Sequence, residues 1–172
     1  MIDVNSVAEK SNFYEQMIEH VFLSEVLQET WFRYKTVVEI LRAEIDSSGY
    51  DVVLECNEVI RHVQLKTSIT NARKTIIKAN TGLCTKPSGC IIWIEWELNE
   101  SKRVTFNYLL FGSKPGEPLP DIYGHKIAKH VKADSQGIKK ERPSMREIKK
   151  TEFKKIKDIG ELIEVLFGLQ RD

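Results

Sequence analysis

The chain has 172 residues, which is enough for one domain with a hydrophobic core and too few for two comfortable ones. Hydrophobic residues make up 41% of the sequence, charged residues make up 30%, and the net charge is +1, which excludes a disordered, collagen-like or uniformly basic chain. No apolar run approaches the roughly 20 residues that span a bilayer, and the N-terminus does not resemble a signal peptide, so we expect a cytoplasmic protein without membrane contacts.

The first predicted element is a helix over residues 13–32. Its apolar side chains recur at helical spacing. They are Phe13, Met17, Val21, Phe22, Val26, Leu27 and Trp31. A strand is expected over residues 36–41, which are rich in β-branched side chains, and a turn at residues 46–49 ends it.

Residues 51–55 and 59–67 predict a β-hairpin joined by a turn at Asn57 and Glu58. Successive side chains of a strand point to opposite faces, so each strand has one apolar and one polar face. We expect Val52, Leu54, Val63 and Leu65 to be buried on one side, and Asp51, His62, Gln64 and Lys66 to be presented on the other.

The second half of the chain begins with the apolar run 90–96, which predicts a buried central strand. Another strand is expected over residues 104–111, then a loop rich in Pro and Gly, and a final helix over about residues 152–168. This order predicts a single α/β domain over residues 1–172 with a central mixed sheet flanked by helices and a core of about 13–111.

Chemistry is suggested by three residues of the predicted hairpin, Asp51, Gln64 and Lys66. Residues i and i+2 of a strand face the same way, so Gln64 and Lys66 lie on one face, with Asp51 at the start of the neighbouring strand. A carboxylate there can bind Mg²⁺, and an ammonium group can orient or deprotonate a water molecule. The ordinary alternatives are an Asp that closes a turn and a Lys that protects a strand edge.

These residues carry a resemblance to a known family. Gly-Tyr-Asp-Val-Val at 49–53, followed by Val-Gln-Leu-Lys-Thr-Ser at 63–68, resembles the PD-(D/E)xK nuclease superfamily, which includes type II restriction enzymes, Holliday-junction resolvases and Mrr-like proteins. The family core is a helix bearing Glu, a strand, an Asp at the head of the second strand, and (Asp/Glu/Gln)-x-Lys on the third. The resemblance covers about residues 13–68 and implies a restriction endonuclease-like α/β sandwich.

The resemblance also implies a site. The catalytic residues would be Asp51, Gln64, Lys66 and Glu19, and an Mg²⁺ or Mn²⁺ ion would be held by Asp51, Gln64, Glu19 and the carbonyl of Leu65. Glu25 is the alternative helix residue, since it lies about 240° around the helix from Glu19 and the two cannot face one site. Gln64 departs from the commonest pattern because its amide adds no charge to the metal site, although glutamine here resembles the Mrr-like variant.

Charge is distributed unevenly along the chain. Residues 1–60 contain twelve acidic and four basic side chains, a net −8, whereas residues 126–157 contain twelve basic and four acidic ones, a net +8. The basic segment predicts contacts with a phosphate backbone. The residues proposed for these contacts are Lys126, Lys129, Lys132, Lys139, Lys140, Arg142 and Arg146. A solvated basic surface is the alternative.

The sequence therefore predicts a metal-dependent nuclease that hydrolyses phosphodiester bonds in nucleic acid, with DNA as the expected partner. Two alternatives keep the fold without the chemistry: a non-catalytic nucleic-acid-binding module, and a regulatory or interaction module such as a component of a defence system. Restriction-type enzymes are often dimers, so a homodimer is one arrangement that the resemblance allows.

Overall fold

The computed structural model describes residues 9–42, 48–70, 72–130 and 136–170, which form an α/β protein with two β-sheets. The larger sheet contains β1 (Glu39–Arg42), β2 (Val52–Cys56), β3 (Val59–Ile69), β5 (Gly89–Leu98), β6 (Val104–Gly112) and β9 (Lys154–Ile156), in that spatial order. The smaller sheet has the order β4 (Ile76–Asn80), β8 (Glu141–Lys149) and β7 (Ile127–Lys129). The helices are α2 (Ser11–Tyr34), α3 (Ile159–Phe167) and the short 3₁₀ turns η1 (Thr81–Thr85) and η2 (Lys150–Glu152).

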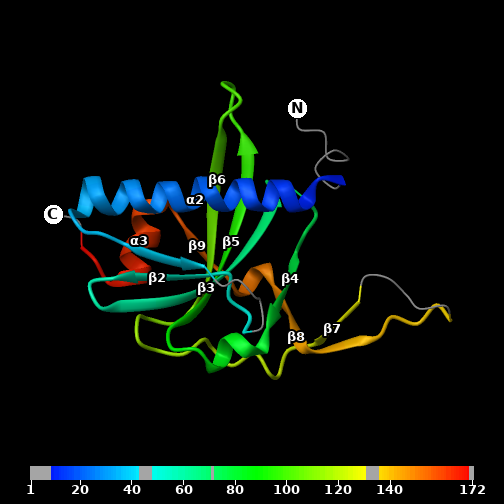
Figure 1. Cartoon of the computed structure of the whole chain (residues 1–172). Coiled ribbons are helices and arrows are strands. Elements are labelled where there is room, and N and C mark those ends of the chain that lie inside the picture. The colour runs from blue at the N-terminus through cyan, green and yellow to red at the C-terminus, as the bar shows by residue number, and fades with distance from the viewer. Residues whose placement is uncertain (1–8, 43–47, 71, 131–135, 171–172) are drawn as a thin grey trace.

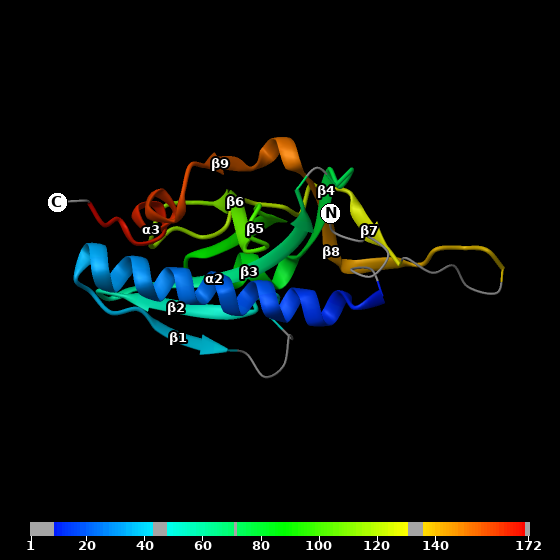
Figure 2. The ribbon, with the colours of Figure 1, turned by 90° about the horizontal axis from the view of Figure 1, so that it is seen from above.

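The larger sheet is mixed, as expected. Its neighbouring strands are antiparallel except for β3 and β5, which run parallel. The predicted hairpin is confirmed, because β2 and β3 pair antiparallel with Val52 opposite Val63. The predicted central strand is confirmed too, since every side chain from Cys90 to Trp96 is buried. Figure 2 shows β1 and β2 at one end of this sheet and β9 at the other.

One face of the larger sheet, called the helix face below, packs against both α2 and α3 (Figure 1). The fully buried Phe22 and Val26 of α2 and Ile163 of α3 meet Leu54 and Ile92 of the sheet there. Apolar residues at helical spacing in α2 produce this layer because they form one stripe along the helix. The Tyr34 hydroxyl fastens the two helices together by donating to the carbonyl of Gly160 at 3.2 Å.

The opposite face of the larger sheet is covered by the smaller sheet rather than by a helix. Ile77 of β4 and Ile148 of β8 pack there against Ile91 and Trp93 of β5. The expectation of a sheet flanked by helices therefore needs a correction: both described helices lie on one face. The connection from β3 to β5 contains η1 and β4, and the alternating burial of the β4 residues suits a strand and not a helix.

The C-terminal helix is shorter than predicted. The structure has η2 and β9 in the first part of residues 152–168, and α3 begins only at Ile159. Asp158 sets this boundary, because its carboxylate accepts a hydrogen bond from the Glu161 N–H at 2.8 Å and caps the helix. Ile156 pairs with Tyr108, which adds β9 to the edge of the larger sheet.

Within the described ranges, no helix is both long and apolar enough to cross a membrane.

Candidate functional site

A row of polar side chains on β3, here called the polar row, points away from the helix face. Val63 lies in the core under the helices, so the alternation of the strand turns Gln64, Lys66 and Ser68 to the opposite face. The parallel register sets them beside Ile91, Trp93 and Glu95 of β5, respectively. These three β5 side chains lie on the same face as the polar row. The polar and charged side chains of the two strands are therefore neighbours, and a catalytic site could be built from them.

Asp51 lies immediately before β2 and beside the polar row. Its N–H donates to the carbonyl of Val63 at 2.9 Å, and its carboxylate accepts a hydrogen bond from the Leu65 N–H at 2.6 Å. Since β2 pairs Val52 with Val63, continuing the register by one residue sets Asp51 opposite Gln64. The predicted trio of Asp51, Gln64 and Lys66 is therefore brought to one face, with Asp51 fixed at the end of the β2–β3 ladder.

Gln64 is the unusual member of the trio. Its residue is only 2% exposed, yet its side-chain Oε1 has no hydrogen-bond partner among the described residues. Leaving a buried polar atom without a partner costs about 1–3 kcal/mol, so most such atoms in proteins are paired. An amide oxygen is also an acceptable ligand for Mg²⁺. A buried acceptor next to Asp51 is thus suited to a cation.

The Leu65 carbonyl shares this edge of the strand. The N–H and C=O of one residue in an antiparallel strand point to the same side, and the Leu65 N–H points to Asp51. The last β2 residue in the ladder is Val52, opposite Val63, so Leu65 lies beyond the paired part of β2. The Leu65 carbonyl therefore lies on the Asp51 side, where the predicted ligand set requires it.

A second group of residues, here called the Trp93 cluster, surrounds the indole ring opposite Lys66. The Trp93 Nε1–H donates to the Ser68 hydroxyl at 2.8 Å. The ammonium groups of Lys74 and Lys150 lie 6.0 and 5.6 Å from the ring centroid, within cation–π range. Glu95, almost fully buried, forms an ion pair with Lys150 at 2.5 Å.

Lys74 is electrostatically linked to Lys66. Burial of the ammonium group and the positive charge of Lys66 lower the pKa of Lys74, while the negative charge of Glu15 acts to raise it. The Lys74 ammonium also donates to the carbonyl of Thr67 at 3.3 Å. Two lysines thus lie within electrostatic reach of each other at one end of the polar row.

Sequence reasoning missed the Trp93 cluster. The alternation of Trp93 and Glu95 was a usable signal that they share a face. Their position beside Lys66 and Ser68 depends on the parallel pairing of β3 with β5, and a local sequence pattern does not predict which strands pair. The contacts of Lys74 and Lys150 with the ring could not be predicted from the sequence, because both residues lie outside the strands of the larger sheet.

The two candidate helix glutamates are not brought together with Asp51. Glu19 forms an ion pair with Arg42 of β1 at 3.2 Å, and Arg42 lies opposite Val52, whose side chain is on the helix face. Glu25 accepts a hydrogen bond from the Tyr108 hydroxyl at 2.6 Å, also on the helix face. The reason is geometric: α2 covers one face of the sheet, and the polar row occupies the other.

The available oxygen atoms can be compared with the needs of a divalent cation. Among the described residues, no group of three or more His, Cys, Asp or Glu side chains could hold a metal ion. Asp51, Gln64 and the Leu65 carbonyl remain, an all-oxygen set with one formal negative charge. Mg²⁺ accepts such a set because it usually keeps several of its waters and needs only one or two carboxylates.

The predicted phosphate-binding residues lie mainly on and around β7 and β8, which extend away from the larger sheet (Figure 1). Lys129, Lys139, Lys140 and Arg142 are exposed there, and Lys132 lies outside the described residues. Lys126 forms an ion pair with Glu147 at 3.0 Å.

Arg146 has a structural role instead. Its guanidinium donates to the carbonyls of Tyr123, Pro143 and Met145 at 3.3, 2.6 and 3.2 Å. Its Nε and Nη1 atoms are thereby engaged by backbone carbonyls, which makes Arg146 a weaker candidate for phosphate contacts than its exposed neighbours.

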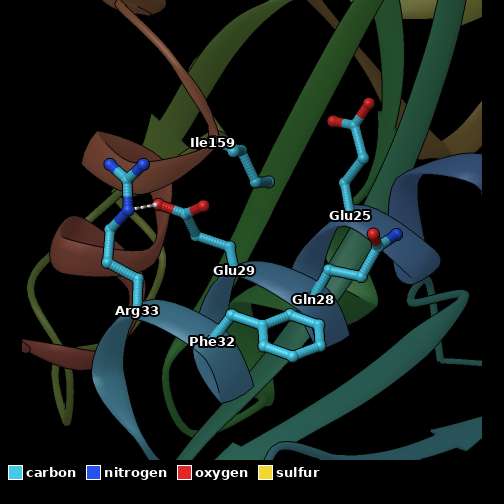
Figure 3. Close-up of a pocket in the computed structure, with 6 residues that line it drawn as sticks. All are labelled: Glu25, Gln28, Glu29, Phe32, Arg33 and Ile159. Atoms are coloured by element: carbon cyan, nitrogen blue, oxygen red, sulfur yellow. Dashed lines mark ion pairs between the residues drawn. The ribbon is translucent and has the colours of Figure 1, made fainter.

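A cavity of about 490 Å³ lies on the helix side, between α2 and the start of α3 (Figure 3). Its lining consists of Glu25, Gln28, Glu29, Phe32, Arg33 and Ile159. Glu29 points to Arg33 and pairs with it at 3.2 Å, and the carboxylate of Glu25 points away from that pair. Both carboxylates have partners, so this cavity offers less chemistry than the polar row.

No family model, no curated protein and no solved structure matches the chain.

Proposed function

We propose that the chain is a metal-dependent nuclease with a restriction endonuclease-like fold, acting on phosphodiester bonds of nucleic acid and most readily of DNA. The observation that carries the proposal is the buried, unpartnered Oε1 of Gln64 beside the carboxylate of Asp51. The order of helix, strand, Asp-bearing strand and Gln-x-Lys strand supports it, because this order matches the core of the PD-(D/E)xK superfamily.

The proposed site divides its work among four residues. Asp51, Gln64 and the Leu65 carbonyl would hold Mg²⁺ or Mn²⁺, which supplies charge neutralisation and a water of lowered pKa when bound. Lys66, two residues along the same strand face from Gln64, would orient the attacking water and stabilise the negative charge that develops on the phosphoryl oxygens. The cluster needs no large rearrangement, since a strand ladder fixes all four backbones.

Glu19 is left out of this proposed ligand set. Its pairing with Arg42 on the helix face gives it a partner of opposite charge already. The proposed site therefore relies on a single carboxylate, and we expect weaker metal binding than a site with two or three carboxylates would have.

The test uses purified protein with supercoiled plasmid and with single-stranded DNA and RNA, in Mg²⁺, Mn²⁺ or EDTA. We expect strand breaks with either metal and none in EDTA. Asp51→Asn is the matched variant because its amide oxygen still accepts the Leu65 N–H bond while the charge is lost; it should abolish cleavage and leave the fold intact. Lys114→Met, an exposed loop change, should cleave normally.

Absence of cleavage for every substrate in both metals would overturn the proposal, and so would equal cleavage by wild type and Asp51→Asn.

One observation favours a second function, a non-catalytic nucleic-acid-binding module. The Asp51 carboxylate already has a structural task, because it accepts the Leu65 N–H where β2 ends. If that is its whole role, the protein should bind DNA equally with Mg²⁺ and with EDTA, and should never cleave it. Measuring binding beside cleavage in the same buffers separates the two functions.

A further inference from the structure

A second cavity, of about 510 Å³, lies where the two sheets join. It is lined by Thr75, Ile76, Lys149, Lys150, Thr151 and Lys155. These residues come from the beginning of β4, the end of β8, η2 and β9, and Figure 2 shows the orange chain passing from β8 to β9 at this place. The Lys150 N–H donates to the carbonyl of Thr75 at 2.8 Å, and this hydrogen bond joins η2 to the residue before β4.

The residues that line the cavity carry groups that can bind an anion, although most of the exposed lining surface is apolar. The lining offers three ammonium groups and two hydroxyl groups and contains no acidic side chain. Lys150 is neutralised by Glu95. Lys149 and Lys155 are exposed, and neither forms an ion pair within the described part of the chain. Ammonium and hydroxyl groups are the usual protein donors to phosphate oxygens.

Lys150 connects this cavity to the proposed active site. Its backbone and side chain border the cavity, while its ammonium group contacts Glu95 and lies over Trp93. Trp93 is the residue opposite Lys66 in the parallel register. One side chain therefore separates the cavity from the Trp93 cluster beside the polar row.

We propose that the cavity formed by Thr75, Lys149, Thr151 and Lys155 binds a backbone phosphate of the nucleic acid whose scissile bond lies at Asp51 and Lys66. This inference rests on the proposed function, since it takes nucleic acid as the ligand. It assigns the main phosphate contact near the active site to the junction of the two sheets, and gives the β7–β8 region a secondary part.

Binding to a short fluorescent DNA duplex, measured by anisotropy in EDTA over a series of salt concentrations, tests the inference without any cleavage. The variant is Lys149→Gln with Lys155→Gln, which removes two exposed charges and leaves the Lys150–Glu95 pair in place. Its matched control is Lys102→Gln with Lys114→Gln, which removes two exposed charges far along the sequence from the cavity. Thermal unfolding of both variants checks the fold.

The cavity variant should bind the duplex about fivefold more weakly for each lysine removed, as expected for exposed charges. The slope of log K against log salt should fall by about 0.9 for each lost phosphate contact. The control pair should bind like wild type. Inorganic phosphate at equal phosphate concentration should displace the duplex poorly, because it lacks the neighbouring contacts.

Equal binding by the cavity variant and the control would overturn the inference, and so would a folded wild type that binds no nucleic acid, or displacement by inorganic phosphate as effective as by unlabelled duplex. The two proposals fail separately. If the cavity variant loses affinity but wild type does not cleave, the phosphate site is supported and the nuclease proposal is refuted. If wild type cleaves with metal but the salt slope of the cavity variant equals that of wild type, the nuclease proposal is supported and the phosphate site is refuted.

Discussion

Two neighbouring positions of β3, Val63 and Gln64, bury side chains of different kinds on opposite faces of the sheet. On the helix face, Val63 is fully buried among apolar side chains from both helices. The next residue, Gln64, is nearly as buried on the other face and leaves its Oε1 without a partner in the described structure. Of these two adjacent residues, one buries only apolar atoms and the other buries a polar atom that has no hydrogen-bond partner in the described structure. Natural proteins tolerate such local costs chiefly at functional sites, and the contrast therefore marks the polar row.

Burial of polar groups is not itself the difference, because the helix face contains a polar pair made of the buried Tyr108 and the half-buried Glu25. Tyr108 donates a hydrogen bond to Glu25 there, so both groups have a partner. Burial raises the pKa of the Tyr108 phenol, and the hydrogen bond to the Glu25 carboxylate raises this pKa further. Unpartnered buried atoms are not confined to one face, because Nε and Nη1 of the fully buried Arg61, opposite Leu54 on the helix face, also lack partners in the described structure. The polar row differs in that its unpartnered atom is an acceptor beside a carboxylate.

The largest effect is expected from Phe22→Ala on the helix face. Phe22 is fully buried between α2 and the sheet, and truncating such a side chain removes apolar burial and leaves a cavity. The free energy of unfolding should fall by about 3–5 kcal/mol, measured by denaturant titration. Phe32→Ala, at a residue that is 68% exposed on the same helix, should change it by less than about 0.5 kcal/mol. Similar losses for both variants would contradict the assignment of the helix face as the core.

Lys66→Met tests the polar row. The apolar part of the side chain is kept, so stability should change little, while cleavage should fall by at least about 100-fold, the lower end of what a positioned proton-transfer group contributes. Single-turnover cleavage at saturating Mg²⁺ measures the rate of the chemical step. Lys74→Met is the companion variant, because Lys74 lies within electrostatic reach of Lys66 but outside the polar row. A larger loss in Lys74→Met would transfer the catalytic role to Lys74.

Tyr108→Phe measures the polar pair of the helix face. Losing a hydrogen bond to a charged acceptor should cost about 2 kcal/mol in the free energy of unfolding, with cleavage unchanged. The pKa of Tyr108 is higher in the folded protein than in the unfolded chain, so the folded state keeps the proton and the stabilisation is complete below about pH 10. Above that pH, wild type should lose about 1.4 kcal/mol per pH unit from this group.

The control for this prediction is the difference between the two proteins across the alkaline range. Tyr108→Phe lacks the titrating group, so the stability gap should narrow as the pH rises, which urea titrations at several pH values would reveal. A gap that stays constant would mean that the phenol titrates equally in the folded and unfolded states.

Much of the fold was readable from local patterns. The spacing of apolar residues from Phe13 predicted α2, the alternation around Val63 predicted the faces of the β2–β3 hairpin, and the run from Cys90 predicted a buried strand. These signals are strong because helix and strand periods differ. The spacing of apolar residues was partly wrong about the buried face of α2, because Phe13, Leu27 and Trp31 are exposed there. The final helix was predicted several residues too early, because the apolar residues Phe153 and Ile156 also fit a helical spacing.

What the sequence did not reveal depends on which elements pack together. Choosing between Glu19 and Glu25 assumed that α2 faces the polar row, and only the packed structure turns both toward the helix face. Likewise, the alternation in residues 76–80 is compatible with a strand, but it does not indicate that this strand belongs to a second sheet covering the other face. The alternation of β3 predicted that Gln64 shares a face with Lys66, but not that its oxygen would be buried without a partner.

Gln64→Glu separates the two interpretations of the polar row, and in Mg²⁺ its expected effect is the smallest of the set. The change is nearly isosteric and adds one negative charge beside Asp51. Without metal, a buried carboxylate near another carboxylate should lower the free energy of unfolding at neutral pH. With Mg²⁺, the additional charge should strengthen metal binding by about tenfold, since ligand charge tunes affinity. Thermal unfolding in EDTA and in a series of Mg²⁺ concentrations measures both effects.

The matched control is Gln28→Glu, which adds the same charge on the exposed side of α2. A metal site at the polar row requires that Mg²⁺ raises the melting temperature of Gln64→Glu more than that of wild type, because a ligand stabilises the folded state in proportion to its affinity. If Asp51 serves only to close the β2–β3 ladder, Gln64→Glu should be destabilised equally with and without Mg²⁺. The unpartnered amide oxygen of Gln64 would then be a packing cost with no function attached, and the difference between Val63 and Gln64 would lose its functional meaning.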